Sequence, residues 1–466
     1  MNPNRLELDR EEMRRLGYRA VDMLVEEFAE AGSKPVGRKA PREQLMAALD
    51  EPPPRQGVPL DRIFERLERD VFQNVLKVHH PRFFAFVPGP SNFAGAVAEM
   101  LAAGHNVFAG NWLSGSAAAA MELVVTGWLR DLCGLAPQAE GLFVSGGSVA
   151  NLTGLLVARR KVLDDRVEGA VAYMSDQTHS SVERALRVIG LRPEQIRKLP
   201  SNDHFQMPLH DLRAAVAADR AAGRRPFCVI ANAGTTNTGA VDPLNELADL
   251  CEAEELWLHA DGAYGAAAAI CERGRRVLSG LDRLDSLSMD PHKWLFQPFE
   301  TGCAFVREGP LLKQTFRITA DYLRDVHRFG EEVHFCDRGV QLTRSFRSLK
   351  VWLTIQVFGV EALQRAVSRG FELAEHAEHT LRRMESFEVV TPANMAVVTF
   401  RRVGLPDEAY EETVARMLEE GYAFLTSTVL RGRPVLRLCT INPRTSEADI
   451  ETTLERLDRV AGQLAR

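Results

Sequence analysis

The stretch Ser286-Leu287-Ser288-Met289-Asp290-Pro291-His292-Lys293-Trp294 places a lysine shortly after an apolar run. The run 286–289 has the length and composition of a buried β-strand, so Lys293 is expected at the carboxyl end of that strand. An amine that aromatic side chains partly shield from water favours its neutral form, which is the form that makes imines. A surface lysine in a turn has the same local sequence, so the rest of the chain has to decide between these interpretations.

Short apolar runs alternate with helical stretches through the middle of the chain. The candidate strands are 141–145, 171–175, 196–199, 227–231, 256–260, 286–289 and 302–306. The candidate helices between them include 149–160, 178–189, 210–222 and 244–255. This alternation predicts an α/β fold with a mostly parallel seven-stranded sheet and helices on both faces. Ligands of such sheets bind beyond the carboxyl ends of the strands, so the residues there are the candidate site.

The chain divides into three predicted parts. Residues 1–85 are expected to form an N-terminal helical arm, because apolar residues recur at helical spacing in 8–30 and a Pro/Gly-rich connector follows. Residues 86–345 contain the predicted sheet and form the large domain. Residues 346–466 predict a smaller α+β C-terminal domain with two or three short strands. The apolar stripe of the arm is expected to pack on its own chain or on a partner subunit.

The composition narrows the class of protein. The 466 residues carry a formal net charge of −6, which argues against nucleic-acid and anionic-membrane partners because both need a concentrated positive surface. The seven cysteines are widely spaced and form no CxxC or Cys/His cluster, so neither a disulfide framework nor a metal site is expected. The sequence has no run of about 18 apolar residues and no apolar signal segment, so we expect a reduced, cytoplasmic protein.

Small and polar residues follow several of the other predicted strands. Gly147 and Ser148 stand between a strand and a helix, where backbone N–H groups and the positive end of the helix dipole can hold a phosphate. His179 lies at the next junction of strand and helix, where an imidazole can stack on an aromatic ring. Thr236 belongs to a polar turn after the fourth predicted strand. Each of these motifs also has an ordinary explanation as a cap or a turn.

Asp261 adds a carboxylate at the end of the apolar run 256–260. At such a place a carboxylate can keep a pyridinium N–H protonated, which lets pyridoxal 5′-phosphate (PLP) act as an electron sink. A lysine, a carboxylate, a phosphate cradle, a stacking group and a polar turn thus fall at strand ends of one predicted sheet. Their coincidence predicts an enzyme that carries PLP as a Schiff base on Lys293.

These residues resemble the group II PLP-dependent decarboxylases, closest to the aromatic-L-amino-acid decarboxylase type. The resemblance begins with the arm and HPRFFAF at 80–86 and continues through DQTHSSVER at 176–184. It then covers the Asp261 and Lys293 motifs and reaches FRSLK at 346–350. It implies a homodimer of the fold-type I, aspartate-aminotransferase-like architecture, acting on a small-molecule amino acid.

The resemblance also implies roles for individual residues. Lys293 would form the Schiff base, and Asp261 would pair with the pyridine nitrogen. The remaining cofactor contacts would be His179 on one face of the ring, Ala263 on the other, Thr236 near the ring substituents, and Gly147, Ser148 and His292 around the phosphate. Asp290 departs from the aromatic-type pattern, which has asparagine there, and the role of this extra carboxylate beside a phosphate is open.

Tyr322 matches the tyrosine of the family's mobile catalytic loop, which reaches the active site of the partner subunit. After CO2 leaves, the Cα carbanion needs a proton, and a phenol can deliver it. Related aldehyde synthases have phenylalanine at this position. Tyrosine therefore favours plain decarboxylation over oxidative deamination.

Two alternatives remain open beside decarboxylation and aldehyde synthesis. An aminotransferase usually clamps the substrate carboxylate with a bidentate arginine, and Arg347 or Arg437 fits that role. A catalytically silent PLP-fold protein would have lost Lys293, Asp261 or Tyr322, and all three are present. The family pattern and Tyr322 favour the decarboxylase.

The early aromatic-rich segment predicts the substrate pocket. Its expected lining is Phe83, Phe84, Phe86, Val87, Pro88, Phe108 and Trp112, although some of these residues will belong to the core. Such walls suit an aromatic amino acid such as tryptophan, tyrosine, phenylalanine or DOPA. Gly89 and Gly110 replace the threonine and phenylalanine that are typical of the aromatic type. Both glycines are expected to enlarge or depolarise the pocket, which admits a bulkier indole or an apolar non-aromatic side chain.

Overall fold

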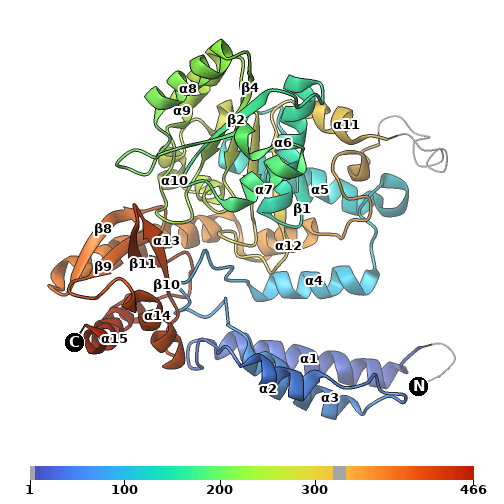
Figure 1. The fold of residues 1–466 in the computed structure, drawn as a ribbon. Helices are drawn as coiled ribbons and strands as arrows, with labels where there is room; N and C mark the ends of the chain where they lie inside the picture. Colours follow the sequence, from blue (N-terminus) through green and yellow to red (C-terminus); the bar gives the residue numbers. More distant parts are fainter. Residues whose placement is uncertain (1–5, 319–331, 466) are drawn as a thin grey trace.

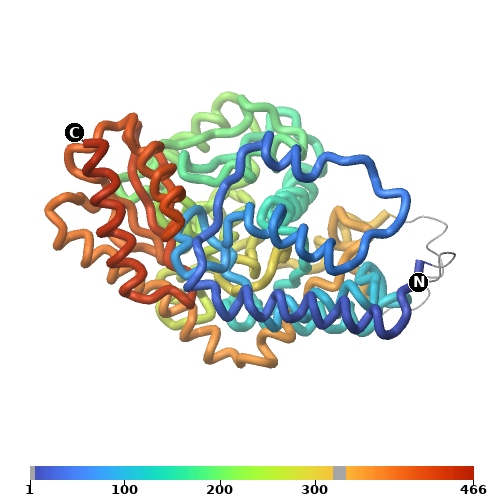
Figure 2. Tube along the Cα trace, turned by 90° about the horizontal axis from the view of Figure 1, so that it is seen from below, coloured from blue at the N-terminus to red at the C-terminus, as the bar shows by residue number. Residues whose placement is uncertain are grey.

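The structure is a computed structural model that describes residues 6–318 and 332–465. In Figure 1, helices surround a central sheet, a smaller unit in orange and red lies beside it, and the N-terminal helices, in blue, lie along one side. The turned view in Figure 2 shows that this N-terminal segment extends across the body of the molecule. Tyr322 lies outside the described residues.

The predicted mostly parallel seven-stranded sheet is confirmed. Within the described residues its strands stand in the order β1-β7-β6-β5-β4-β2-β3, and only β7 runs antiparallel to its neighbours. The strands are β1 (Glu140–Val144), β2 (Ala170–Ser175), β3 (Ile196–Leu199), β4 (Arg225–Asn232), β5 (Trp257–Asp261), β6 (Ser286–Met289) and β7 (Gly302–Val306). Because the parallel strands end at one edge, the loops after them converge there.

Helices cover both faces of this sheet. The main ones are α5 (Trp112–Cys133), α6 (Gly147–Leu163), α7 (Ser180–Val188), α8 (Leu209–Ala221), α9 (Leu244–Ala253), α10 (Glu272–Val277) and α11 (Pro310–Phe316). Phe143 of β1 packs into the core beneath α5, α8 and α9, whereas its neighbours Leu142 and Val144 pack on the other face beneath α6 and α7. Burial on both faces explains why β2, β4 and β7 are mainly apolar, whereas the partly buried edge strand β3 contains Arg197 and Lys198.

The C-terminal part contains a second sheet. Its elements are α12 (Ser348–Phe358), α13 (Val360–Arg383), β8 (Phe387–Asn394), β9 (Val397–Arg402), α14 (Ala409–Glu419), β10 (Thr426–Leu430), β11 (Arg433–Cys439) and α15 (Glu447–Leu464). Among the described residues this sheet has four antiparallel strands in the order β10-β11-β9-β8. The sequence did not predict β10, because this edge strand is mostly half-exposed and lacks a run of apolar residues.

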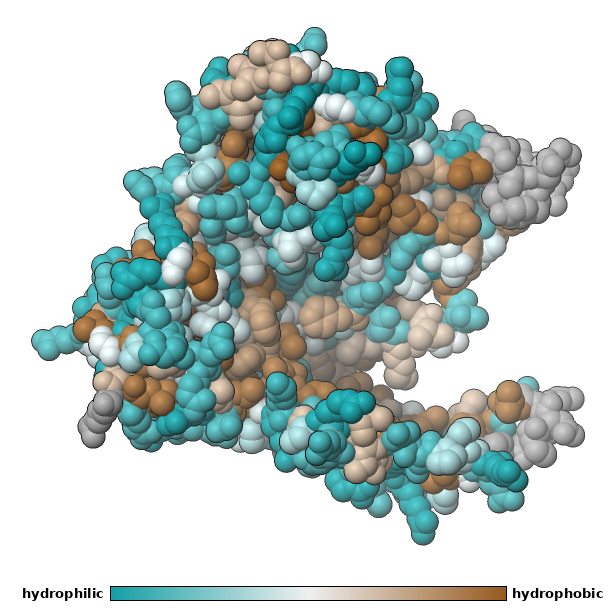
Figure 3. Space-filling model, viewed as in Figure 1, coloured by the Kyte–Doolittle hydropathy of each residue, from teal (hydrophilic) through white to brown (hydrophobic). Residues whose placement is uncertain are grey.

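The N-terminal arm leaves much of its apolar surface uncovered in one chain. It contains α1 (Arg10–Ala29), α2 (Arg42–Leu49) and α3 (Leu60–Arg66), and α4 (Phe93–His105) follows. Phe28 of α1 stacks on His79, with ring centroids 5.4 Å apart, so α1 contacts its own chain. Met13, Leu24 and Val25 on α1 nevertheless remain exposed. Figure 3 shows apolar residues, in brown, at several places on the surface of the arm and of the body above it. The limits of the arm at 1–85 and of the domains at 86–345 and 346–466 stay predictions.

A buried ion pair joins the helix α5, the strand β1 and the segment before α12. Arg344 Nη2 lies 2.5 Å from Glu122 Oε1, and their side chains are 2% and 1% exposed. Arg344 also donates to the backbone carbonyls of Phe143 and Ala109, at 2.6 and 3.0 Å, while Phe143 N–H donates to Glu122 at 2.8 Å. These hydrogen bonds give both buried ions the partners that water would otherwise provide.

We expect the Glu122→Ala variant to lose about 3–5 kcal/mol of unfolding free energy, because it leaves the Arg344 guanidinium buried without its anion. Urea denaturation followed by circular dichroism measures this loss. The matched control is Glu308→Ala, which removes an exposed partner of Lys161 and should cost at most about 1 kcal/mol. Equal losses in the two variants would contradict the role of burial.

Candidate active site

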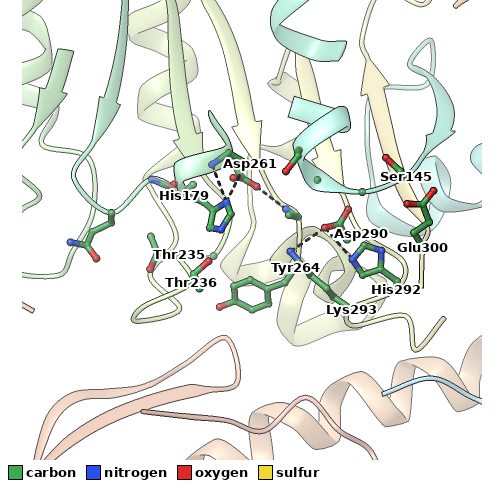
Figure 4. Close-up of a pocket in the computed structure, with 18 residues that line it drawn as sticks. Ser145, His179, Thr235, Thr236, Asp261, Tyr264, Asp290, His292, Lys293 and Glu300 are labelled. Atoms are coloured by element: carbon green, nitrogen blue, oxygen red, sulfur yellow. Dashed lines mark hydrogen bonds and ion pairs between the residues drawn. The ribbon is translucent and has the colours of Figure 1, made fainter. Parts of the chain in front are cut away.

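A cavity of about 310 Å³ lies beyond the carboxyl ends of the parallel strands. Figure 4 shows His179, Thr235 and Thr236 on one side of it and Asp290, His292 and Glu300 on the other, with Asp261 between them. Its lining includes all eight residues that the sequence assigned to the cofactor, namely Gly147, Ser148, His179, Thr236, Asp261, Ala263, His292 and Lys293. The structure therefore brings together residues that lie up to 146 positions apart in the sequence.

Asp261 is fixed at the end of β5 by hydrogen-bond donors. Its Oδ2 accepts from Asn151 Nδ2 at 3.2 Å, and its Oδ1 accepts from Ser288 Oγ at 3.2 Å and from the Ala263 N–H at 3.1 Å. The partners come from α6, β6 and the turn after β5, so three parts of the fold orient one carboxyl group. An acceptor held in this way suits a ligand that presents an N–H donor.

A chain of buried polar groups stands behind Asp261. Asn151 Oδ1 lies 2.9 Å from His259 Nε2, and Ser286 Oγ lies 2.8 Å from both His259 Nδ1 and Trp257 Nε1. Burial lowers the pKa of His259 to about 4, so its ring is neutral and carries one proton. Since the Asn151 amide nitrogen already donates to Asp261, its oxygen accepts from His259 Nε2–H. His259 Nδ1 then accepts from the Ser286 hydroxyl. Each group in this series therefore donates to the next one toward Asp261.

The same chain reaches His179 at the start of α7. Asn151 Nδ2 lies 3.2 Å from Ser181 Oγ, which in turn lies 2.8 Å from His179 Nδ1. The Ser181 N–H also donates to His179 Nδ1, at 3.3 Å, so this nitrogen acts as an acceptor. The sequence-based interpretation missed Asn151, Ser181 and His259, although all three lie in its motifs. For His259 the available signal was a polar side chain inside an otherwise apolar strand, which requires a buried partner.

The amine of Lys293 lies beside a buried carboxyl group. Its Nζ is 3.0 Å from Asp290 Oδ2, and His292 Nε2 is 3.6 Å from the same oxygen (Figure 4). Burial and the nearby Lys293 lower the pKa of His292 to about 4, so the imidazole is neutral. Its Nδ1 accepts from the Thr301 N–H at 3.1 Å, which leaves the proton on Nε2, toward Asp290.

The start of α6 provides a close-fitting place for an anion. This 17-residue helix begins at Gly147, so its unpaired N–H groups and its positive dipole end border the cavity. A Cβ on Gly147 would lie 2.9 Å from Asp290 Oδ2 and 3.0 Å from Ala263 Cβ. Only glycine therefore fits without moving the neighbours. An amine, a fixed carboxylate and a helix N-terminus in one cavity match the aldehyde, ring nitrogen and phosphate of PLP.

Arg347 and Arg437, the candidate carboxylate clamps of an aminotransferase, bind other groups of this chain. Arg437 donates to the backbone carbonyls of Phe86 and Thr236, and Arg347 pairs with Glu300 at 2.8 Å. Neither belongs to the described residues that line the cavity. Arg437 thus fixes the backbone beside the cavity, and the geometry gives no support for a carboxylate clamp.

In this single chain, the aromatic residues that the sequence predicted for the substrate pocket do not line one cavity. Phe84 is buried in the core of the small sheet, and Phe83 packs edge-to-face against Phe424, so assigning both to the pocket was wrong. Their segment runs beside the small sheet, which covers these side chains. Phe86 is 58% exposed. Val87 and Trp112 pack partly against the cores of the large sheet. None of the predicted pocket residues, Phe84, Phe86, Val87, Pro88, Phe108 and Trp112, is among the described residues that line the cavity.

A larger side chain at Gly89 or Gly110 would meet neighbouring atoms, although Gly89 also borders a second cavity of about 610 Å³. A Cβ on Gly110 would lie 2.4 Å from Phe108 Cζ, and a Cβ on Gly89 would lie 2.7 Å from the His292 carbonyl oxygen. Neighbouring atoms already fill the space that larger side chains would take. This corrects the expectation from the sequence, which treated each missing side chain as empty volume.

Comparison with known proteins agrees with this geometry. Residues 42–403 match the family model of the pyridoxal-dependent decarboxylase conserved domain. An aromatic-L-amino-acid decarboxylase from Bacillus atrophaeus is 44% identical and covers 99% of this chain and 98% of its own. Tryptophan decarboxylase 2 of Oryza sativa is 32% identical over 95% of this chain and 93% of its own. The crystal structure of Oryza sativa TDC with PLP and tryptamine superposes with a TM-score of 0.94 at 30% identity and covers all of both chains.

The fold and the cofactor class define a fold-type I PLP enzyme. Within that class, the chain belongs to the pyridoxal-dependent decarboxylase family, and it is a PLP-dependent decarboxylase. The described residues contain no helix of the length and apolarity that crossing a bilayer requires. They also contain no cluster of side chains suited to hold a metal ion.

Proposed function

We propose that this enzyme decarboxylates an aromatic L-amino acid to the corresponding amine and CO2. The observation that carries the proposal is the meeting of Lys293, Asp261 and the start of α6 in one cavity. The similarity to an aromatic-L-amino-acid decarboxylase and to a tryptophan decarboxylase supports an aromatic substrate. PLP, when bound, supplies the electron sink for the electron pair that remains on Cα when CO2 leaves.

Each residue of the cavity has a proposed task. Lys293 would hold the cofactor covalently, and Asp261 would keep the ring nitrogen protonated by accepting its N–H. His179 and Ala263 would pack against the two faces of the ring. Gly147, Ser148 and His292 would hold the phosphate, and Thr236 would lie near the ring substituents. The hydrogen bonds of Asn151 support this arrangement, because they orient Asp261 directly and His179 through Ser181.

The test is product analysis with purified protein and PLP. Tryptophan, tyrosine, phenylalanine, DOPA and glutamate are incubated separately, and mass spectrometry and CO2 release are measured. Amine and CO2 in equal amounts from an aromatic substrate, with none from glutamate, are expected. Formation of a keto acid only after an amino acceptor is added would instead indicate an aminotransferase.

We expect the Tyr322→Phe variant to make amine about 10²-fold more slowly, because the proposed proton donor to Cα is lost. Aldehyde, ammonia and oxygen consumption should rise, since the unprotonated carbanion is open to oxidation. Tyr410→Phe is the control, because this tyrosine of α14 is buried in the core of the small sheet and lies outside the cavity. Unchanged amine formation by Tyr322→Phe would refute the proton-donor role.

We also propose that the enzyme is a cytoplasmic homodimer with shared active sites. Met100 and Leu101 on α4 and Val357 and Phe358 on α12 are exposed, and these helices pack against each other. Together with the uncovered face of α1, they offer apolar surface to a second copy. Each of the seven cysteines is buried with a free thiol, which suits a reducing compartment.

Mixed dimers test the shared site directly. If Tyr322 serves the partner's cavity, a dimer of one Lys293→Ala and one Tyr322→Phe subunit contains one intact site. Random pairing of the two inactive variants should then restore about a quarter of the parent activity. No recovery, although mass measurement finds mixed dimers, would place Tyr322 in the cavity of its own chain.

A further inference from the structure

Asp290 has a buried carboxyl group at the helix end that the proposed function assigns to the cofactor phosphate. Its side chain is 2% exposed. Oδ2 contacts Lys293, but no hydrogen bond from the described residues reaches Oδ1, although this oxygen is buried. Oδ1 lies 4.0 Å from the Cβ position of Gly146, at the start of α6. An unused polar atom therefore borders the phosphate site.

The charges around Asp290 come from several elements. Burial raises the pKa of Asp290 to about 6, and Asp261 adds to this rise, while Lys293 and the Gly147 N–H oppose it. His292 is neutral, because burial lowers its pKa to about 4. Cys303 of β7 is also neutral, because burial holds its pKa well above the usual value. Among these described groups, Lys293 is the cation that faces Asp290.

A phosphate at the start of α6 would add negative charge beside Asp290, and among the groups named above Lys293 is the cation that can balance it. An ionised carboxylate beside a phosphate has no proton to share, and the two anions repel each other in a site with little water. A neutral carboxylic acid has one O–H donor and carries no charge. A close hydrogen bond between Asp290 and a phosphate dianion therefore requires the protonated form of the carboxyl group.

We propose that Asp290 binds the cofactor phosphate as a carboxylic acid, which it becomes by taking up one proton when the phosphate enters. The O–H then donates to a phosphate oxygen. The proton comes from solvent, and no covalent bond is made or broken at Asp290. This inference rests on the proposed function, because it requires the phosphate to lie at the start of α6.

The proposal makes cofactor binding dependent on pH with a definite sign. The nearby phosphate raises the pKa of Asp290 above its value of about 6 in the free protein. Between these two pKa values the complex holds one proton more than the free protein. Cofactor affinity should therefore fall as pH rises, by up to about tenfold per pH unit.

The probe is pyridoxamine 5′-phosphate, which carries the phosphate but has no aldehyde to bond to Lys293. Its Kd for the full-length protein, stripped of PLP, is measured from pH 6.5 to 8.5 for the parent and for Asp290→Asn. Asparagine keeps the shape and donates an N–H at every pH. We expect the ratio of parent Kd to variant Kd to rise about tenfold per pH unit. Calorimetry in two buffers of different ionisation enthalpy should show that the parent takes up about one proton more per site at pH 7.5.

Ser148→Ala separates the two possible failures. If this variant binds the probe as tightly as the parent at every pH, the phosphate lies elsewhere and the proposed site is wrong. If it binds more weakly while Asp290→Asn leaves the pH slope and the proton count unchanged, only the inference about Asp290 is wrong. Should Asp290→Asn fail to fold, infrared spectra of the parent decide. A carboxylic-acid carbonyl band must appear on binding of the probe, and its absence overturns the proposal.

Discussion

Replacement of Lys293 by alanine is expected to slow decarboxylation by about 10⁴-fold or more, the scale on which loss of a covalent catalytic group slows an enzyme. The amine is the group in the cavity that can bond to the cofactor aldehyde, and it lies 3.0 Å from Asp290. Borohydride reduction followed by peptide mass spectrometry should find the cofactor on the Lys293 peptide of the parent protein. The variant should carry no covalent cofactor.

Two further variants make this prediction specific. Lys293→Arg keeps a positive charge beside Asp290 but cannot form the bond, so it should be as inactive as the alanine variant. Lys198→Ala removes an exposed lysine whose partner is Glu183, and it should retain parent activity. Thermal unfolding is measured for all three, because Lys293→Ala leaves Asp290 without its cation. A folded Lys293→Ala protein that still binds the cofactor covalently would disprove the assignment.

The Asp261→Asn variant is expected to lose about 10³-fold in kcat, as when a fixed electrostatic partner is removed from an active site. The parent carboxyl group accepts from Asn151, Ser288 and Ala263, so both oxygens face donors. An amide places its NH2 group against one of those donors and has no charge to keep a pyridinium protonated. KM should change much less than kcat, because the substrate contacts are intact.

Asp219→Asn is the matched control for this substitution. Asp219 is a buried carboxylate that accepts from Tyr173 at 2.9 Å and pairs with Arg197 at 2.6 Å, but it does not line the cavity. It should lower the thermal midpoint and leave kcat near the parent value. Parent-like kcat and cofactor absorbance in Asp261→Asn would rule out a role of Asp261 at the ring nitrogen.

The position of Asp290 shows where sequence comparison and structure complement each other. The sequence identified it as a departure from the asparagine of the aromatic type and left its role open. The structure adds the 3.0 Å contact with Lys293, the burial and the unpartnered Oδ1. Only this combination leads to a prediction about protons, because a charge is defined by its surroundings and not by residue type.

The sequence by itself determined the sheet and the edge at which the cavity lies. Apolar runs and the polar loops that follow them are local features of the sequence. They placed Gly147, His179, Asp261 and Lys293 at one edge of the sheet without coordinates, and the roles of these residues toward the cofactor stay predictions. The chain of Asn151, Ser181, His259 and Ser286 required the tertiary structure, because its hydrogen bonds join α6, α7, β5 and β6 across more than a hundred residues. The packing of Phe84 into the small sheet and the filled space at Gly89 and Gly110 also depend on distant segments. Local patterns set which residues form each element, whereas contacts between elements decide which side chains are core and which reach the site.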